Sequence, residues 1–155
     1  MREQERDRLR NNAFAMIFQA HHLMLYLSVL ENVLLPGANG FRGISAQQRQ
    51  RAVSCLERVG LGHKKHSLPS ELSGGEQQRV AIARGLASDP RILFADEPTG
   101  SLDMATGDSI MQLLRELNGE GLTIVMVTHN PDYAALAGRC VQMREGRVLP
   151  DGTPA

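Results

Sequence analysis

The sequence predicts an α/β fold with a parallel sheet. In the second half of the chain, short apolar runs alternate with segments whose apolar residues follow the helical period, which is the order of elements in parallel α/β proteins. The run at 123–128 (TIVMVT) is apolar and β-branched almost throughout, as expected for a strand that is covered on both faces. Strand signals are few between about residues 20 and 90, so we expect a helical insertion there.

Length, charge and cysteine content narrow the class of protein. A chain of 155 residues fits one domain, and its 17 basic and 17 acidic residues give no support for nucleic-acid binding. Cys55 and Cys140 lack the spacing of a metal site or a disulfide framework, which suits a reducing cytoplasm. His63 and His66 form a His-x-x-His without further ligands, so no metal site is expected there. No apolar stretch approaches the ~18 residues of a membrane span and no signal peptide is expected, so a membrane role would act through a partner.

The first half of the chain holds one expected strand and two expected helices. Residues 13–18 form a short apolar run that predicts a buried strand. Two residue pairs have the spacing of a capping box, which marks the start of a helix; they are Ser45 with Gln48, and Ser73 with Glu76. The helices are expected to end at Gly60 and before Asp89-Pro90.

The second half alternates strands and helices. The pattern predicts strands at 92–95 and 123–128 and a helix at about 105–118 between them. A short helix is expected near 132–136. A hairpin-like turn at Gly146 is expected after a last apolar run at 141–143.

Ser73-Gly74-Gly75 stands where a helix is expected to begin. Free amides at a helix start, together with the helix dipole, form a site for anions. Two glycines let a phosphate approach the backbone without meeting a Cβ atom. The alternative is a capped helix with flexible glycines and no role in binding.

Asp96 and Glu97 follow the apolar run at 92–95. Open α/β sheets bind ligands beyond the carboxyl ends of their strands, so both carboxylates are expected at such an edge. A first carboxylate there suits Mg²⁺, which retains water ligands. A second can orient and deprotonate an attacking water. The alternative is a plain turn after a strand.

Gln19, Asp103 and His129 are further candidates with ordinary alternatives. Gln19 ends the first expected strand, His129 follows the run at 123–128, and Asp103 closes a polar loop after Glu97. A glutamine or histidine in these places is otherwise a solvated surface residue. Asp103 is otherwise the N-cap of the next helix, and both roles are compatible.

Three strings carry a resemblance to a known family. They are LSGGEQQR at 72–79, DEPTGSLD at 96–103 and VTHN at 127–130. In this order they resemble the signature motif, the Walker B motif with its D-loop, and the switch histidine of ABC transporter ATP-binding subunits. The resemblance covers nearly the whole chain. It implies a P-loop NTPase-like parallel sheet, present in part, with an α-helical ABC subdomain: one partial domain over 1–155, with the subdomain at about 20–90 and the C-terminal part of the α/β core at about 91–155.

The resemblance also implies a role for each candidate. Glu97 would be the catalytic base, and His129 would contact the γ-phosphate and help to hold the attacking water. Asp96 and Gln19 would hold Mg²⁺. Residues 73–75 would contact ATP bound to the opposite subunit. ATP and Mg²⁺ are the implied cofactors, and the implied nucleotide-binding residues are Gln19, Ser73, Gly74, Gly75, Glu76 and Asp103.

A finer resemblance concerns the branch of the family. FQAHHLM at 18–24 and LENV at 30–33 resemble the lipoprotein-releasing and macrolide-export group of bacterial ABC ATPases. This implies ATP hydrolysis at the interface of a subunit dimer, coupled to export or lipoprotein release by an integral membrane permease at the inner face of the cytoplasmic membrane. Leu25 departs from the group, where a proline is common in the loop that docks to the membrane subunit. Gly85 stands where alanine is common and should weaken a helix by up to ~1 kcal/mol.

One motif of the family has no counterpart in this sequence. The pattern G-x-x-x-x-G-K-[ST], whose amides and lysine cradle the β- and γ-phosphates, matches nowhere. We therefore expect this chain to be inactive alone, while residues 73–75 can still serve an intact partner. Two alternatives stay open: a non-catalytic fragment or regulatory partner, and a soluble ABC ATPase of DNA repair or translation, whose usual insertions or fused cassettes this sequence does not contain.

Overall fold

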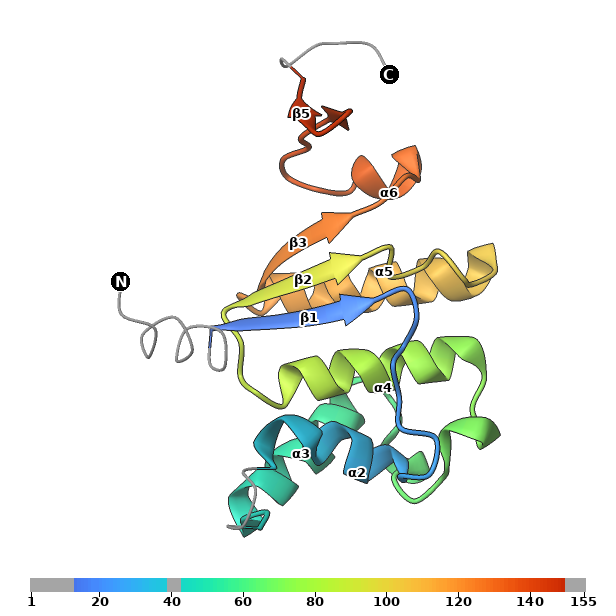
Figure 1. The fold of residues 1–155 in the computed structure, drawn as a ribbon, viewed down its shortest axis with the longest axis vertical. Coiled ribbons are helices and arrows are strands. Elements are labelled where there is room, and N and C mark those ends of the chain that lie inside the picture. Colours follow the sequence, from blue (N-terminus) through green and yellow to red (C-terminus); the bar gives the residue numbers. More distant parts are fainter. Residues whose placement is uncertain (1–12, 39–42, 150–155) are drawn as a thin grey trace.

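A computed structural model describes residues 13–38 and 43–149 (Figure 1). Three strands form a parallel sheet in the order β1-β2-β3, and a two-stranded antiparallel hairpin lies towards the C-terminus. The strands are β1 (Phe14–Phe18), β2 (Ile92–Asp96), β3 (Thr123–Val127), β4 (Met143–Arg144) and β5 (Arg147–Val148). The expected parallel α/β fold is therefore confirmed.

The helices fall close to where the sequence predicts them. Both expected capping boxes are formed, by Ser45 with Gln48 and by Ser73 with Glu76. A further helix, α2, was not expected; it begins with a third capping box, in which Ser28 pairs with Glu31. The helices are α2 (Val29–Leu34), α3 (Ala46–Arg58), α4 (Gly74–Leu86), α5 (Met104–Gly119) and α6 (Pro131–Ala134), with 3₁₀ turns at Leu35–Gly37, Gly62–Lys64 and Pro69–Glu71.

The core lies between one face of the sheet and helices α4 and α5. Every second residue of β1 and β2 points to this face, so Ile17 and Leu93 are fully buried. They join one apolar cluster with Ile110 and Leu117 of α5 and Ile82 of α4. Helices α2 and α3 pack beside α4 and extend the cluster away from the sheet (Figure 1).

The opposite face of the sheet is exposed. Val127 of β3 is 60% exposed, and the rings of Phe14 and Phe94 lie against each other on this face with centroids 5.8 Å apart. The prediction that the run at 123–128 is covered on both faces is wrong for this structure. The described helices pack on one face only, and the inward residues of β3 are only half-buried.

No helix within the described ranges has both the length and the apolar character needed to span a membrane. The longest, α5, has 16 residues.

Candidate functional site at the carboxyl edge of the sheet

The ends of the three parallel strands bring the predicted side chains to one edge. Phe18, Asp96 and Val127 stand side by side in the register. Gln19, Glu97 and His129 therefore leave the sheet at the same edge, although up to 110 residues of chain separate them. A backbone hydrogen bond of 3.0 Å from the amide of Glu97 to the carbonyl of Val127 extends the pairing one residue beyond β2.

Glu97 and His129 are bound directly to each other. The amide of His129 donates to Oε1 of Glu97 at 2.8 Å, and Nδ1 of the same histidine lies 2.8 Å from that oxygen. The Glu97 side chain is 21% exposed, whereas that of His129 is 81% exposed. Oε2 of Glu97 has no hydrogen-bond partner among the described residues, so it is available to accept a proton from a water molecule.

The backbone of Glu97 is in a conformation that few glutamates adopt. Its φ of 46° lies in the left-handed region, which costs a non-glycine residue about 1 kcal/mol or more. The surrounding bonds hold it there, since the Glu97 amide is paired with β3 and its carbonyl accepts from the amide of Gly100 at 3.0 Å. The turn aims the carboxylate at His129 rather than along the strand.

Gly100 brings Gln19 next to Glu97. A Cβ atom at Gly100 would lie 3.0 Å from Nε2 of Gln19 and 3.4 Å from Cβ of Glu97. A side chain at this position would therefore crowd the Gln19 amide, whereas its distance to Glu97 is an ordinary contact. The sequence reasoning did not single out Gly100; a glycine within a polar loop between two carboxylates was the available signal.

A pocket of about 200 Å³ opens beside Glu97 and His129. The loop from Thr99 to Leu102 forms one wall, and the start of α6 with Tyr133 forms another. The hydroxyl of Tyr133 donates to Oδ1 of Asp108 at 3.1 Å, which fixes that wall against α5. The lining residues are Glu97, Thr99, Gly100, Leu102, Met104, Thr128, His129, Asn130 and Tyr133.

Asp96 is exposed at the end of β2, next to Glu97. No salt bridge or hydrogen bond of its side chain to another described residue is found, and no group of three metal-binding side chains occurs within the described ranges. The exposed Asp96 carboxylate, with the Gln19 side-chain amide at the same edge, fits Mg²⁺, because Mg²⁺ takes few protein ligands and keeps its waters.

The start of α4 presents free amides beside the polar loop. Ser73 caps the helix, and the amides of Gly74 and Gly75 have no acceptor within the described part of the chain. A Cβ atom at Gly74 would lie 3.3 Å from Leu102, and one at Gly75 would lie 2.3 Å from Cγ2 of Thr106. The glycines are therefore needed for packing as well as for an open backbone.

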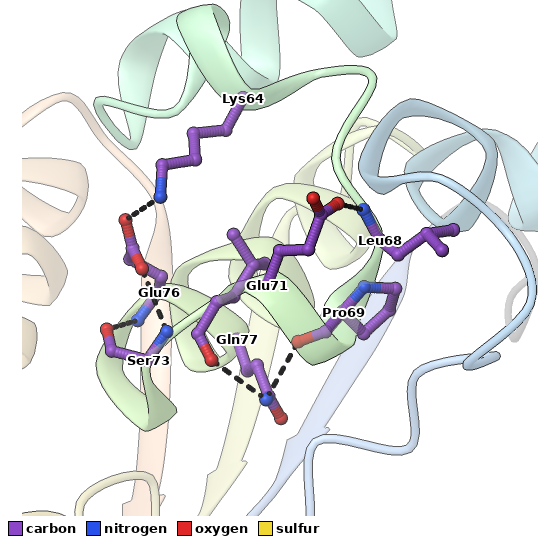
Figure 2. Close-up of polar contacts among 8 residues, drawn as sticks. Lys64, Leu68, Pro69, Glu71, Ser73, Glu76 and Gln77 are labelled. Atoms are coloured by element: carbon purple, nitrogen blue, oxygen red, sulfur yellow. Dashed lines mark hydrogen bonds and ion pairs between the residues drawn. The ribbon is translucent and has the colours of Figure 1, made fainter.

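Glu76 turns back onto the helix start rather than outwards. Its carboxylate accepts the amide of Ser73 at 2.8 Å and lies 3.2 Å from Nζ of Lys64 (Figure 2). The hydrogen bond from Ser73 lowers the pKa of Glu76 below its ordinary value, and Lys64 acts in the same direction. The negative charge near the free amides is thus neutralised within the chain.

The turn that leads into α4 is held by two side chains. Nε2 of Gln77 donates to the carbonyl of Pro69 at 3.1 Å and to that of Leu72 at 3.3 Å (Figure 2). Glu71 accepts the amide of Leu68 at 2.6 Å. These bonds give the helix start a defined direction.

Asp103 is the N-cap of α5, as the alternative for this residue proposed. Its Oδ1 accepts the amide of Thr106 at 3.0 Å, and its Oδ2 accepts the Thr106 hydroxyl at 2.6 Å. These two bonds lower the pKa of Asp103. The cap leaves Asp103 exposed at the end of the loop that joins the sheet edge to α5.

The structure thus forms two groups of candidate residues, joined by the loop at 98–103. One group holds the strand-end residues and the other the start of α4. Carboxylates at the carboxyl edge of a parallel sheet together with a glycine-rich helix start are typical of phosphate-binding α/β proteins.

Comparison with known proteins makes this class more specific. Residues 1–100 match the sequence profile of the family described as "ABC transporter". That match spans more than half of the chain, so the chain belongs to the ABC transporter family.

Two relatives resemble the chain over most of its length. The chain is 51% identical over 147 residues to the lipoprotein-releasing system ATP-binding protein LolD 2 of Rhodopirellula baltica, covering 91% of this chain and 58% of that protein. It is 47% identical over 149 residues to the macrolide export ATP-binding/permease protein MacB of Chromobacterium violaceum, covering 95% of this chain and 23% of that protein. The chain therefore spans only part of each.

A solved structure shares the fold. The ATP-binding cassette MJ0796, a dimer in a post-hydrolysis state bound to ADP and Pi, superposes with a TM-score of 0.78 at 41% identity. The match covers 96% of this chain and 66% of that one.

Proposed function

We propose that this chain provides catalytic and nucleotide-contacting residues of an ATP-hydrolysing subunit of a bacterial ABC transporter. ATP is bound between two such subunits, and its hydrolysis drives export or lipoprotein release through a membrane permease. The observation that carries the proposal is the Glu97–His129 pair at the carboxyl edge of the sheet. The names of the relatives support the export and lipoprotein-releasing branches.

Glu97 is the general base in this proposal. Its Oε1 is held by His129, so Oε2 faces the space where a water molecule can lie. His129 orients this carboxylate through its amide, and its exposed ring is free to contact a terminal phosphate. General-base catalysis of this kind contributes about 10²- to 10⁴-fold to a rate.

Asp96 and Gln19 would hold Mg²⁺ at the same edge. When bound, Mg²⁺ neutralises charge on the phosphate oxygens. Gln19 lies next to Gly100, which also neighbours Glu97, so its amide oxygen would be a ligand close to the base.

The start of α4 serves the nucleotide held by the partner subunit. The amides of Gly74 and Gly75 point out of the helix, and the helix dipole favours an anion there. Ser73 and Glu76 fix the geometry through their reciprocal cap, and Asp103 lies at the junction between the subunits.

The partners are a second ATPase subunit and an integral membrane permease. Such a chain works at the inner face of the cytoplasmic membrane. Leu25 is 68% exposed and Tyr26 is 79% exposed on the loop before α2, and this apolar loop forms part of the surface that docks to the permease.

Glu97→Gln tests the proposal. In the assembled protein, the variant should keep ATP binding and lose hydrolysis by about 10²-fold or more, because an amide cannot accept the proton. Glu145→Gln is the matched control, since Glu145 is also a glutamate with positive φ, at 50°, but lies in the β4–β5 turn. Hydrolysis by Glu97→Gln at the rate of the unmodified protein would exclude Glu97 as the base.

A further inference from the structure

The segment that follows β1 carries Gln19 but has no regular secondary structure. Residues 19 and 20 form a bend after β1, and residues 21–24 continue without regular structure towards α2. His22 has a φ of 49°, a conformation that needs support from its surroundings. Its ring stacks edge-on against Phe18 at 5.2 Å.

Arg84 of α4 holds this segment by its backbone. One guanidinium nitrogen donates to the carbonyl of His22 at 2.6 Å, and the other donates to the carbonyl of His21 at 2.9 Å. The two bonds come from one planar group, so they restrain orientation as well as position.

Gln78, less than two turns earlier on α4, holds the same segment by a side chain. Its Oε1 lies 2.6 Å from Nδ1 of His21. Gln78 is 0% exposed, and its Nε2 has no hydrogen-bond partner within the described ranges. A buried amide with one unsatisfied group lowers the stability of the fold, so packing alone does not explain a glutamine at position 78. The bond of its Oε1 to His21 does explain it.

We propose that Arg84 and Gln78 are positioning residues that hold residues 19–22 on α4 and thereby keep Gln19 beside Glu97. Arg84 fixes the carbonyls of residues 21 and 22, and Gln78 fixes the ring of His21. Gln19 then has little freedom to leave Gly100. The inference rests on the proposed function only for the role of Gln19.

The same helix therefore carries one group of the candidate site and holds the segment that leads away from Gln19 of the other group. Gly74 and Gly75 begin α4, and Gln78 and Arg84 follow on it. A displacement of the helix start moves Gln78 and Arg84 with it, because α4 is continuous over Gly74–Leu86.

We call the contacts of Arg84 and Gln78 with His21 and His22 the clasp. Backbone order parameters, measured by NMR relaxation on the 155-residue chain, test it directly. In Arg84→Gln, the order parameters of the backbone amides of residues 19–22 should fall from the rigid range near 0.85 to below about 0.6. Arg84→Lys should give intermediate order parameters. Arg79→Gln is the matched control: Arg79 lies on the same helix and donates to Val59 and Ser109 instead. Unchanged order in Arg84→Gln, or equal loss in Arg79→Gln, would overturn the proposal.

Gln78→Met separates positioning from stability. Methionine has a similar volume and removes the unsatisfied amide group, so the folded state should be as stable as before. The His21 side chain should nevertheless become mobile, with averaged ring signals. A His21 ring that stays fixed in this variant would mean that Gln78 does not position it.

A double-mutant cycle in the assembled, ATP-hydrolysing protein links the clasp to Gln19. Arg84→Gln should lower kcat by about tenfold in the unmodified background and have no further effect in a Gln19→Ala background. Additive effects would show that Arg84 does not act through Gln19, even if Glu97→Gln has already established the base. The decrease in order parameters tests the clasp independently of ATP hydrolysis, so a failure of the proposed function would not affect that test.

Discussion

Asn32 is a fully buried amide that shapes the loop before α2. Its Nδ2 donates to the carbonyls of Met24, Leu27 and Ser28, and its Oδ1 accepts the amide of Met24 at 2.8 Å. The carbonyls of Met24 and Ser28 also accept backbone amides, but the amide of Met24 and the carbonyl of Leu27 are paired by the Asn32 side chain. One side chain thus sets how Leu25 and Tyr26 are presented on the surface.

Asn32→Leu should lower the free energy of unfolding by about 2–3 kcal/mol, because it leaves the amide of Met24 and the carbonyl of Leu27 without partners. Urea denaturation followed by circular dichroism measures this change. Asn118→Leu is the control, since Asn118 is exposed and donates one hydrogen bond to Leu122; its cost should stay below about 1 kcal/mol. Equal losses in both variants would mean that the burial of Asn32 is unimportant.

Glu76 gives the stability of the protein a pH dependence. Its pKa in the folded protein lies below the ordinary value of 4.5, chiefly because the Ser73 amide donates to it. A depressed pKa adds stability above the unfolded-state value, and this contribution is lost as the pH falls through the folded-state value. Glu76→Gln keeps a capping partner without the charge.

The difference in unfolding free energy between the unmodified protein and Glu76→Gln should therefore shrink as the pH falls below 4.5. Denaturation at several pH values down to about pH 3 measures it. A difference that stays constant over this range would contradict the assigned pKa direction.

Helix α4 combines three functions in 13 residues. Its first turn presents free amides, its middle packs on the sheet, and its polar side chains hold the segment with Gln19. Two of its glycines, Gly75 and Gly85, differ in their surroundings. A Cβ atom at Gly85 would meet Ala15 and Leu93 at 3.4 Å, which is an ordinary contact, whereas one at Gly75 would meet Thr106 at 2.3 Å.

Gly85→Ala should therefore stabilise the protein by about 0.5–1 kcal/mol, since alanine loses less conformational entropy in a helix. Gly75→Ala should destabilise it by about 1–3 kcal/mol. Thr106 cannot rotate away without breaking its bond to Asp103. Urea midpoints measure both changes, and a loss of stability in Gly85→Ala would show that α4 cannot accept a methyl group at the sheet.

At the scale of the whole molecule, the sheet is covered on one face and open on the other. Helices α4 and α5 bury Ile17 and Leu93. The open face is apolar across all three strands, whereas the faces of parallel sheets are ordinarily buried. Its exposed apolar residues are Phe14, Met16, Phe94, Val125 and Val127.

This face should bind a fluorescent dye that detects apolar surface. Met16→Lys combined with Val125→Lys should reduce the dye signal at least about twofold, because both side chains lie on the open face. Leu136→Lys combined with Val141→Lys is the control, as these residues are exposed outside the sheet. A larger reduction in the control would place the dye elsewhere.

Local patterns predicted most elements and the order of the candidate residues. The capping boxes at Ser45 and Ser73 and the apolar runs depend on neighbours in the chain, so sequence reasoning could place them. The bond between Glu97 and His129, 32 residues apart, the left-handed turn at Glu97 and the clasp on His21 depend on residues distant in sequence. No local pattern contains these contacts.

The sequence by itself determined the α/β class, the strand-end carboxylates and the family, because periodicity and motif spacing are properties of the chain. The tertiary structure alone decided which residues meet. Parallel strands brought Gln19, Glu97 and His129 to one edge, and the packing of α4 on the sheet put Arg84 and Gln78 against His21 and His22. These contacts form only when the apolar faces of the sheet and helices are buried together, since that burial sets the distances between segments remote in sequence.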